Sequence, residues 1–408
     1  MRRRGPVRFL SLTLSVILPS CMGCGNANTS LSTTPPAGSN VQVITVNVGP
    51  TAAAGFGPYI DGAFTSVTLC VPGDTTQCQT IDGVLVDTGS SGLRILSSAL
   101  TISLPQQTDA NNNPIAECAP FSSSVTWGPV QSADMTISGE KASSLSIQVI
   151  GSPSFSTVPS ACSSQGPAEE DLQGLGANGI LGVGSFAQDC GSACAVNGPS
   201  NPGFYYTCPS TGCQITTEAL SQQVVNPVVL FATDNNGVII ELPALSGAAV
   251  SVSGNLVFGI GTESNNGLGN ATVYGVDPAT GNFTTVFNGQ SFTDASFIDS
   301  GSNAIYFLDS TTTGLPICTD ATFWYCPSSL QTLSASNQGA NGTSGTVTFT
   351  VANADTLLAD PSDGAANGLA GPFPGFVDWG LPFFFGRNIY TAIDGQTTPV
   401  GSGPYWAY

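Results

Sequence analysis

Short apolar runs, rich in β-branched residues, alternate along this chain with clusters of glycine, asparagine, proline and serine. Such runs cover residues 41–46, 64–70, 83–87, 144–150, 237–242, 255–260, 284–287, 346–351 and 388–393. Their length and spacing are typical of many short antiparallel strands. Helical periodicity is weak and is confined to residues 217–224. The low-complexity segment 334–345 is predicted to be a mobile loop.

Two apolar stretches, residues 84–86 and 297–298, are each followed by nearly the same four residues. The first reads Asp87-Thr88-Gly89-Ser90 and the second reads Asp299-Ser300-Gly301-Ser302, and the two aspartates are 212 residues apart. One such phrase is a common turn and carries little information. Two copies indicate two related halves, each of which delivers one aspartate to a shared site. Two carboxylates held close together can share one proton, so that one acts as a base and the other as an acid.

The composition supports an all-β fold with two lobes. The chain has 408 residues, which is enough for two lobes that each bury a core. It contains 49 Gly and 28 Pro, while strong helix formers are scarce.

Histidine is absent, which excludes a Ser-His-Asp triad, a Cys-His pair and any metal site with a histidine ligand. Four of the seven basic residues lie in the first eight positions, so only Arg94, Lys141 and Arg387 face 26 acidic residues in the rest of the chain. Nucleic acid is excluded as a partner, because its binding depends on neutralising phosphates. With few ion pairs to lose, the protein should tolerate acid well, although this charge is equally typical of any exported protein.

The N-terminal segment MRRRGPVRFLSLTLSVILPS has the pattern of an export signal, with a basic start before a short apolar stretch. It leads into Leu18-Pro19-Ser20-Cys21, which resembles the lipobox of bacterial lipoproteins and implies lipid attachment at Cys21. The alternative is ordinary cleavage near residues 25–27. Residues 22–40 are predicted to be a flexible tether, because they are rich in Ser, Thr, Pro and Gly.

Beyond Cys21 and Cys24, ten cysteines remain, an even number that suits disulfides in an oxidising compartment. Local pairing predicts three bridges: Cys70–Cys78, Cys118–Cys162 and Cys318–Cys326. Four further cysteines should form two bridges of undetermined connectivity: Cys190, Cys194, Cys208 and Cys213. The alternative for these four is a thiolate zinc site, which the exported location and irregular spacing disfavour, so no metal is predicted.

A resemblance extends over nearly the whole exported part of the chain. Residues 82–95 (DGVLVDTGSSGLRI) resemble the first active-site strand and loop of pepsin-like aspartic peptidases. Residues 178–184 (NGILGVG) resemble the strand that packs under that loop. Residues 125–128 (VTWG) and 133–137 (ADMTI) lie between them, where the family carries its flap hairpin. In the second half, residues 254–261, 297–302 and 384–394 resemble the connecting strand, the second loop and the closing strands. The sequence also resembles a bacterial family of lipoproteins whose function is uncharacterised.

The resemblance implies a bilobal pepsin-like fold of two β-barrel-like lobes with a cleft between them, over residues 41–262 and 263–408. It implies that Asp87 and Asp299 are the catalytic pair, that they hold a water that attacks a peptide bond, and that no cofactor takes part. Four residues would support the pair: Gly89, Ser90, Gly301 and Ser302. Trp127 and Gly128 would form the flap.

Three departures from the family pattern affect these expectations. Trp127 stands where a tyrosine is usual, and its alternative role is that of a packed aromatic residue. Pro382 follows Trp379-Gly380-Leu381 and removes a backbone donor from the second packing strand. Arg94 could pair with a substrate carboxylate, although pairing with a surface acid is the simpler expectation.

Three functions are therefore weighed. The first is an exported aspartic endopeptidase, monomeric and held at the bacterial envelope by its lipid anchor. The second is a non-catalytic envelope protein that binds a peptide or glycan in the cleft. The third is a structural lipoprotein in which both aspartate loops persist only for folding.

Overall fold

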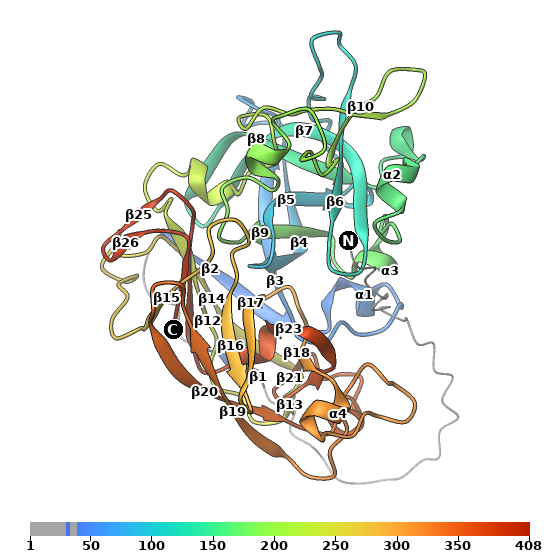
Figure 1. The fold of residues 1–408 in the computed structure, drawn as a ribbon. Coiled ribbons are helices and arrows are strands. Elements are labelled where there is room, and N and C mark those ends of the chain that lie inside the picture. The colour runs from blue at the N-terminus through green and yellow to red at the C-terminus, as the bar shows by residue number, and fades with distance from the viewer. Residues whose placement is uncertain (1–29, 33–38) are drawn as a thin grey trace.

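The computed structural model of the chain describes residues 30–32 and 39–408. The fold is all-β and is dominated by two barrel-like sheets. Figure 1 shows one part of the first sheet above and the second sheet below, while the remaining strands of the first sheet run through the middle of the molecule. The predicted all-β architecture of two lobes is therefore confirmed.

The upper part contains nine strands along one hydrogen-bonded path. These strands are β3 (Gly62–Cys70), β4 (Cys78–Asp87), β5 (Ser91–Leu96), β6 (Ile115–Pro120), β7 (Val125–Ile137), β8 (Glu140–Ile150), β9 (Gly179–Val183), β10 (Tyr205–Thr207) and β11 (Gln214–Ile215).

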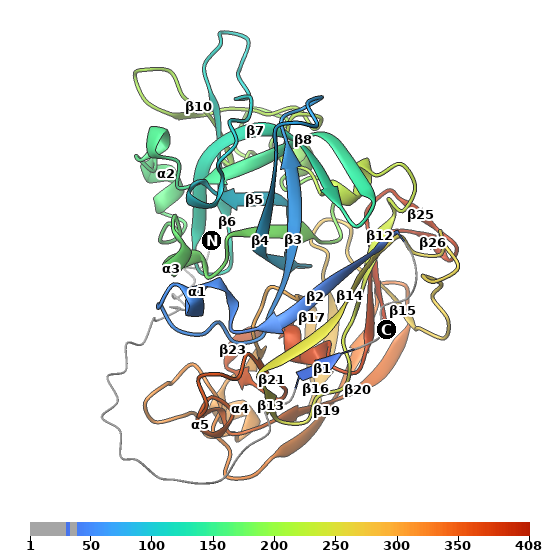
Figure 2. The same cartoon turned by 180° about the vertical axis from the view of Figure 1, so that it is seen from behind.

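The joining strands continue this path from β3 through β2, β14, β12, β24 and β27 to β15. Their bounds are β2 (Val41–Asn47), β12 (Gly237–Glu241), β14 (Ser251–Phe258), β15 (Val273–Gly275), β24 (Asn388–Ala392) and β27 (Tyr405–Ala407). Figure 2 shows β2 and β14 side by side across the junction. Strand β1 (Ser30–Ser32) pairs with β14, so part of the segment predicted to be a tether is a strand.

The lower sheet has seven strands in the order β20-β19-β16-β17-β23-β18-β22. Their bounds are β16 (Phe283–Phe287), β17 (Gln290–Ile298), β18 (Ile305–Leu308), β19 (Gln331–Gln338), β20 (Ser344–Val351), β22 (Ala370–Gly371) and β23 (Phe373–Trp379). Two further strand pairs form separate two-stranded sheets. They are β13 (Ala248–Ala249) with β21 (Ala365–Ala366) and β25 (Thr397–Thr398) with β26 (Gly401–Ser402).

Helices are short and peripheral in the described residues. They are α1 (Gly49–Ala53), α2 (Ser160–Ser163), α3 (Leu172–Leu175), α4 (Ser310–Thr313) and α5 (Ala354–Leu357). The weak helical periodicity of residues 217–224 does not correspond to a helix, because turns and irregular backbone occupy this stretch.

The prediction of a mobile loop at residues 334–345 is also wrong. This segment contains the end of β19, a short turn and the start of β20, which pair in an antiparallel hairpin. Its small polar residues still alternate between the two faces, and Ala335 and Asn337 are buried. Asn337 donates to the Tyr408 hydroxyl and accepts from Thr285 Oγ1, which fixes the hairpin against the sheet.

The largest apolar cluster runs beneath both aspartate phrases. It contains Val86 and Leu181 below Asp87, and Ile298 and Trp379 below Asp299. Both phrases therefore begin where a strand ends in the core, since Val86 and Ile298 are fully buried, and this fixes the direction in which each carboxyl leaves its sheet.

Candidate functional site

Asp87 is the last residue of β4, and a strand from much later in the sequence supports it. Strand β9 inserts between β4 and β5, parallel to β4 with Asp87 opposite Gly182, and antiparallel to β5. A Cβ atom at Gly182 would lie 2.8 Å from the Gly92 carbonyl oxygen, so glycine permits the close packing of this strand. Residues 178–184, which contain β9, therefore pack beside the first aspartate loop, as predicted.

Asp299 directly follows β17 in the same local arrangement. Strand β23 inserts between β17 and β18, parallel to β17 and antiparallel to β18. Gly380 is the counterpart of Gly182, because a Cβ atom there would lie 2.0 Å from the Ala304 carbonyl oxygen. Pro382 lies in the first turn of the short 3-10 helix Leu381–Phe383, where no backbone donor is lost. The support of the second loop is thus intact.

The second residue of each phrase reaches across to the other phrase. Thr88 Oγ1 donates to the Ile298 carbonyl at 3.1 Å and accepts from the Ser300 N–H at 2.9 Å. Ser300 Oγ donates to the Val86 carbonyl at 2.7 Å and accepts from the Thr88 N–H at 3.1 Å. All four bonds are buried. They bring the two loops together although 212 residues separate them.

The two carboxyl groups face one another across this junction. A Cβ atom on Gly89 would lie 2.5 Å from Asp299 Cγ, and one on Gly301 would lie 2.7 Å from Asp87 Oδ1. Each glycine thus leaves the space that the opposite carboxyl fills. Asp87 is only 5% exposed, but Gly89 is exposed and Asp299 is half-buried. Solvent therefore reaches the pair at this edge.

Each carboxylate receives the same pair of donors from its own phrase. Asp87 accepts from the Gly89 N–H at 2.8 Å and from Ser90 Oγ at 2.5 Å. Asp299 accepts from the Gly301 N–H at 2.7 Å and from Ser302 Oγ at 2.9 Å. Gly89, Ser90, Gly301 and Ser302 thus make the contacts that the resemblance implies.

Burial raises the pKa of Asp299 well above its ordinary value, and the neighbouring carboxyls of Asp87 and Asp378 raise it further. Burial and neighbouring negative charge both favour the neutral form, so Asp299 keeps its proton next to the Asp87 carboxyl. The arrangement can therefore take one proton from a bound water and offer another to the substrate.

Several groups near the pair carried no clear signal in the sequence. Asp378, the residue before Trp379, is buried and lies 2.7 Å from Ser302 Oγ through its Oδ2 atom. Asp61 is fully buried and accepts from the Ala366 N–H at 2.7 Å. Tyr59 is half-buried, and burial together with the charges of Asp87 and Asp299 raises its pKa. The cross-bonding of Thr88 and Ser300 could have been inferred, because both phrases carry a hydroxyl at that position.

Trp127 lies in β7 opposite Cys118 of β6, next to Gly128. Its side chain is 0% exposed, donates through Nε1 to the Phe155 carbonyl at 2.8 Å and packs edge-on against Tyr206. Trp127 is therefore a packed core residue, which is the alternative role that the sequence left open for it. Its indole is not available to a substrate in this conformation.

Arg94 is buried and pairs with acids inside the protein, so the expectation of a surface acid is wrong. Its Nη2 atom lies 2.6 Å from Glu117 Oε1 and 3.4 Å from Asp189 Oδ2. Asp189 also accepts from the Tyr205 hydroxyl at 2.7 Å. Because β5 runs straight from the first aspartate loop into the core, the residue at position 94 faces inward.

The ten remaining cysteines form five disulfides. Cys70–Cys78, Cys118–Cys162 and Cys318–Cys326 are paired as predicted. The four whose connectivity was open pair as Cys190–Cys194 and Cys208–Cys213, so they offer no thiolates to zinc. In the described residues, the acidic and sulfur groups close enough for a metal are Cys318, Cys326 and Asp355, and both sulfurs are in a disulfide.

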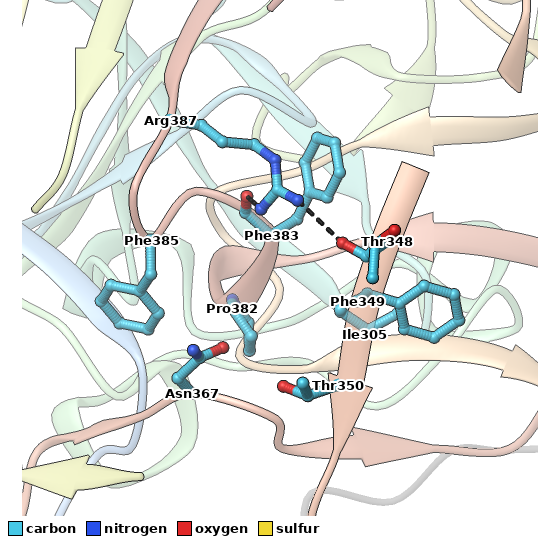
Figure 3. Close-up of a pocket in the computed structure, with 9 residues that line it drawn as sticks. All are labelled: Ile305, Thr348, Phe349, Thr350, Asn367, Pro382, Phe383, Phe385 and Arg387. Carbon is cyan, nitrogen blue, oxygen red and sulfur yellow. Dashed lines mark hydrogen bonds between the residues drawn. The ribbon is translucent and has the colours of Figure 1, made fainter. Parts of the chain in front are cut away.

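A separate pocket of about 170 Å³ lies beside β20 and the turn after Gly380 (Figure 3). Arg387 lines it, with its guanidinium 4.4 Å from the centre of the Phe383 ring. The same guanidinium donates to the carbonyls of Phe383 and Thr348, at 2.7 and 2.9 Å. Arg387 thus ties the turn to β20.

Cys21 and the predicted signal segment 1–21 lie outside the described residues. Within the described part of the chain, no helix combines the length and apolar character needed to span a membrane. The five disulfides indicate an extracytoplasmic protein.

Comparison with known proteins adds one finding to this geometry. Residues 36–408 match the protein family described as "Protein of unknown function (DUF3443)". No curated protein matches the chain.

Proposed function

The chain belongs to the protein family described as "Protein of unknown function (DUF3443)", and we propose that it is an exported aspartic endopeptidase with a pepsin-like fold. In this proposal the two barrel-like sheets are the two lobes, and a peptide binds at the edge where Gly89 is exposed. The protein acts as a monomer and needs no cofactor.

One observation carries the proposal, namely the contact between Asp87 and Asp299 through the space left by Gly89 and Gly301. A turn that serves only folding does not need an opposite carboxyl so close to its glycine. Bringing two buried acids together also costs free energy, because each disfavours ionisation of the other. A catalytic pair gains from this arrangement, since it retains one proton.

In the proposed reaction a water lies between the two carboxyls. Asp87, which accepts hydrogen bonds from the Gly89 N–H and Ser90 Oγ, takes a proton from the water as the water attacks the peptide carbonyl carbon. Asp299 holds the shared proton and donates it to the carbonyl oxygen. Collapse of the tetrahedral intermediate then breaks the C–N bond: the leaving nitrogen receives the proton held by Asp87, and one hydroxyl of the intermediate returns its proton to Asp299. Positioned acid–base groups of this kind each contribute about 10²–10⁴-fold in rate.

The experiment is cleavage of a broad peptide library between pH 3 and pH 7, with products identified by mass spectrometry. The wild type should cut, and Asp87→Asn should abolish cleavage while keeping the fold. Asp82→Asn is the matched control, because Asp82 is an exposed acid on the same strand. Cleavage that persists in Asp87→Asn rejects the assignment.

The alternative is a non-catalytic envelope protein that binds a peptide or glycan. It is favoured by the burial of Trp127, which leaves no aromatic flap side chain at the position that the resemblance implied. A statine-type inhibitor separates the two functions, because its hydroxyl mimics the attacking water. Thermal stabilisation by the inhibitor, lost in Asp299→Asn, supports the peptidase, and equal stabilisation of both proteins supports the binding protein.

The proposed site of action is the outside of the bacterial cell, with the mature chain anchored by a lipid on Cys21. Mass spectrometry of the mature N-terminus tests this step. A diacylglyceryl-modified Cys21 supports the anchor, whereas a free terminus near residues 25–27 supports simple secretion.

A further inference from the structure

A third carboxyl group lies where the other half of the molecule has an apolar side chain. Asp378 of β23 is in register with Phe297, two residues before Asp299. In the upper sheet, Ile180 of β9 is in register with Leu85, two residues before Asp87. The two local arrangements are otherwise alike, so Asp378 marks an asymmetry on the Asp299 side.

Asp378 is connected to Asp299 through one hydroxyl group. Ser302 Oγ lies 2.9 Å from Asp299 Oδ2 and 2.7 Å from Asp378 Oδ2. A serine hydroxyl has one hydrogen, so it can donate to only one of these oxygens. The second contact is a hydrogen bond only if one of the two carboxyls carries a proton and donates it to Ser302. The geometry therefore favours a proton on at least one of them.

The surroundings of Asp378 contain no cation among the described residues. The side chain is 5% exposed, and its Oδ1 atom has no hydrogen-bond partner. The titratable groups that face it are Asp87, Asp299 and Tyr306, which is opposite Asp378 in β18. Asp61 and Tyr59 lie beyond Tyr306. Burial raises the pKa of Asp378, and the charge of Asp87 adds to this effect.

The basic residues of the described chain have partners elsewhere. Arg94 pairs with Glu117 and Asp189, Lys141 pairs with Asp134, and Arg387 donates to backbone carbonyls. Among the described residues, no cation therefore lies beside the carboxyl groups of Asp87, Asp299 and Asp378. A negative charge on Asp378 thus disfavours a second one on Asp299 and raises the pKa of Asp299.

We propose that Asp378 is a positioning residue that exchanges protons with Asp299 through Ser302 and so keeps the aspartate pair singly protonated to a higher pH. This inference rests on the proposed peptidase function. In the exchange, Asp299 passes its proton to Ser302 Oγ while the Ser302 proton moves to Asp378, so the number of protons is conserved. The substrate is then a peptide cleaved in a mildly acidic to neutral medium, not only in strong acid.

The direction of the effect follows from the charges. When Asp378 ionises, it repels a second negative charge on the pair and draws the Ser302 hydrogen away from Asp299. Both changes make it harder for the pair to lose its last proton. A neutral group at position 378 has neither effect. Removing the carboxyl must therefore lower the pH at which the pair loses that proton.

Two variants test this. Asp378→Asn is neutral, and its amide can still donate to Ser302, whereas Asp378→Ile copies Ile180 of the other half. Asp320→Asn removes one exposed negative charge elsewhere and is the matched control. In the full mature chain, kcat/KM is measured against pH, and the Asp299 carboxyl is titrated by ¹³C NMR as a readout that does not need activity.

In both Asp378 variants the alkaline limb of kcat/KM and the Asp299 titration should move down by about one pH unit, while the control does not move. On that limb, one unit is a tenfold loss of activity at fixed pH. Unchanged titration in both variants overturns the inference and leaves the peptidase proposal standing. A shifted titration in a protein that cuts no peptide supports the proton exchange and rejects the peptidase function.

Discussion

Each hydroxyl residue in the two aspartate phrases has its own role. Ser90 and Ser302, in the fourth position, bond to the carboxylate of their own phrase. Thr88 and Ser300, in the second position, bond across to the backbone of the other phrase. The first pair orients the carboxyls and the second pair holds the two halves of the site together.

The cross-bonding leads to a stability prediction. Thr88→Val keeps the shape of the side chain but removes the hydroxyl, so the Ser300 N–H and the Ile298 carbonyl lose a buried partner. Two such losses should lower the free energy of unfolding by about 2–3 kcal/mol. Thr80→Val, at an exposed hydroxyl, is the control and should change it by less than about 0.5 kcal/mol. Urea unfolding measures both, and equal stability of the two variants would contradict a structural role for the cross-bonds.

The sequence was informative about the aspartates themselves and less so about their neighbours. Asp87, Asp299 and their glycines could be identified because the phrase is duplicated. Asp378 could not, because a buried acid beside Trp379 looks the same in sequence as a surface acid at the end of a strand. Its role becomes visible only when β23 inserts next to β17.

At the scale of elements, strands with an apolar run were predicted well, since burial on one or both faces imposes a recognisable pattern. The predicted run 388–393 corresponds to β24 (Asn388–Ala392), and 237–242 corresponds to β12. The run 346–351 corresponds to most of β20, but β19 and the turn between them were missed, because their polar, glycine-rich composition hides a period of two. The partners of β19, such as Tyr408, lie about seventy residues away in the sequence.

Arg94 forms buried ion pairs whose contribution to stability should depend on pH. Arg94→Leu removes the cation from between Glu117 and Asp189 and should cost about 3–5 kcal/mol at pH 7, the usual cost of breaking a buried ion pair. The cost should be smaller at pH 4. Burial and the neighbouring Glu117 raise the pKa of Asp189, so this acid enters the folded state with its proton at low pH.

Chemical unfolding of Arg94→Leu at both pH values measures this difference. Arg387→Leu is the matched control, because the partners of Arg387 are backbone carbonyls. The loss of unfolding free energy caused by this substitution should not depend on pH. A cost for Arg94→Leu that is the same at pH 4 and pH 7 would show that the ion pair has no electrostatic role in stability.

At the scale of the whole molecule, the described chain has many more acids than cations and buries several of the acids. Burial raises the pKa of Asp61, Asp189, Asp299 and Asp378 well above the ordinary value, and that of Glu218 to about 7. These groups bind protons more tightly in the folded state. The stability that they contribute is present below pH 4 and is lost as the pH rises through their folded-state pKa values.

Two exposed acids have the opposite effect. Hydrogen bonds from Thr76 and Gln77 lower the pKa of Asp74 to about 2, and bonds from Thr207 and Asn113 do the same for Asp109. Their contribution is present above pH 4 and is lost as the pH falls toward 2. The melting temperature should therefore be highest near pH 4 and fall on both sides. Calorimetry from pH 2 to pH 9 checks this, and a melting temperature that rises steadily from pH 4 to pH 8 would contradict it.

The proposed mechanism depends on Asp87 and Asp299 acting as one unit, and a double-mutant cycle on kcat/KM tests this most directly. On the best substrate from the library, Asp87→Asn and Asp299→Asn should each lower kcat/KM by about 10³-fold or more. The double variant should be no worse than either single variant, because each substitution already removes the shared proton. Losses that multiply in the double variant, or a single variant that keeps a tenth of the wild-type rate, would show that the two aspartates do not form one catalytic site.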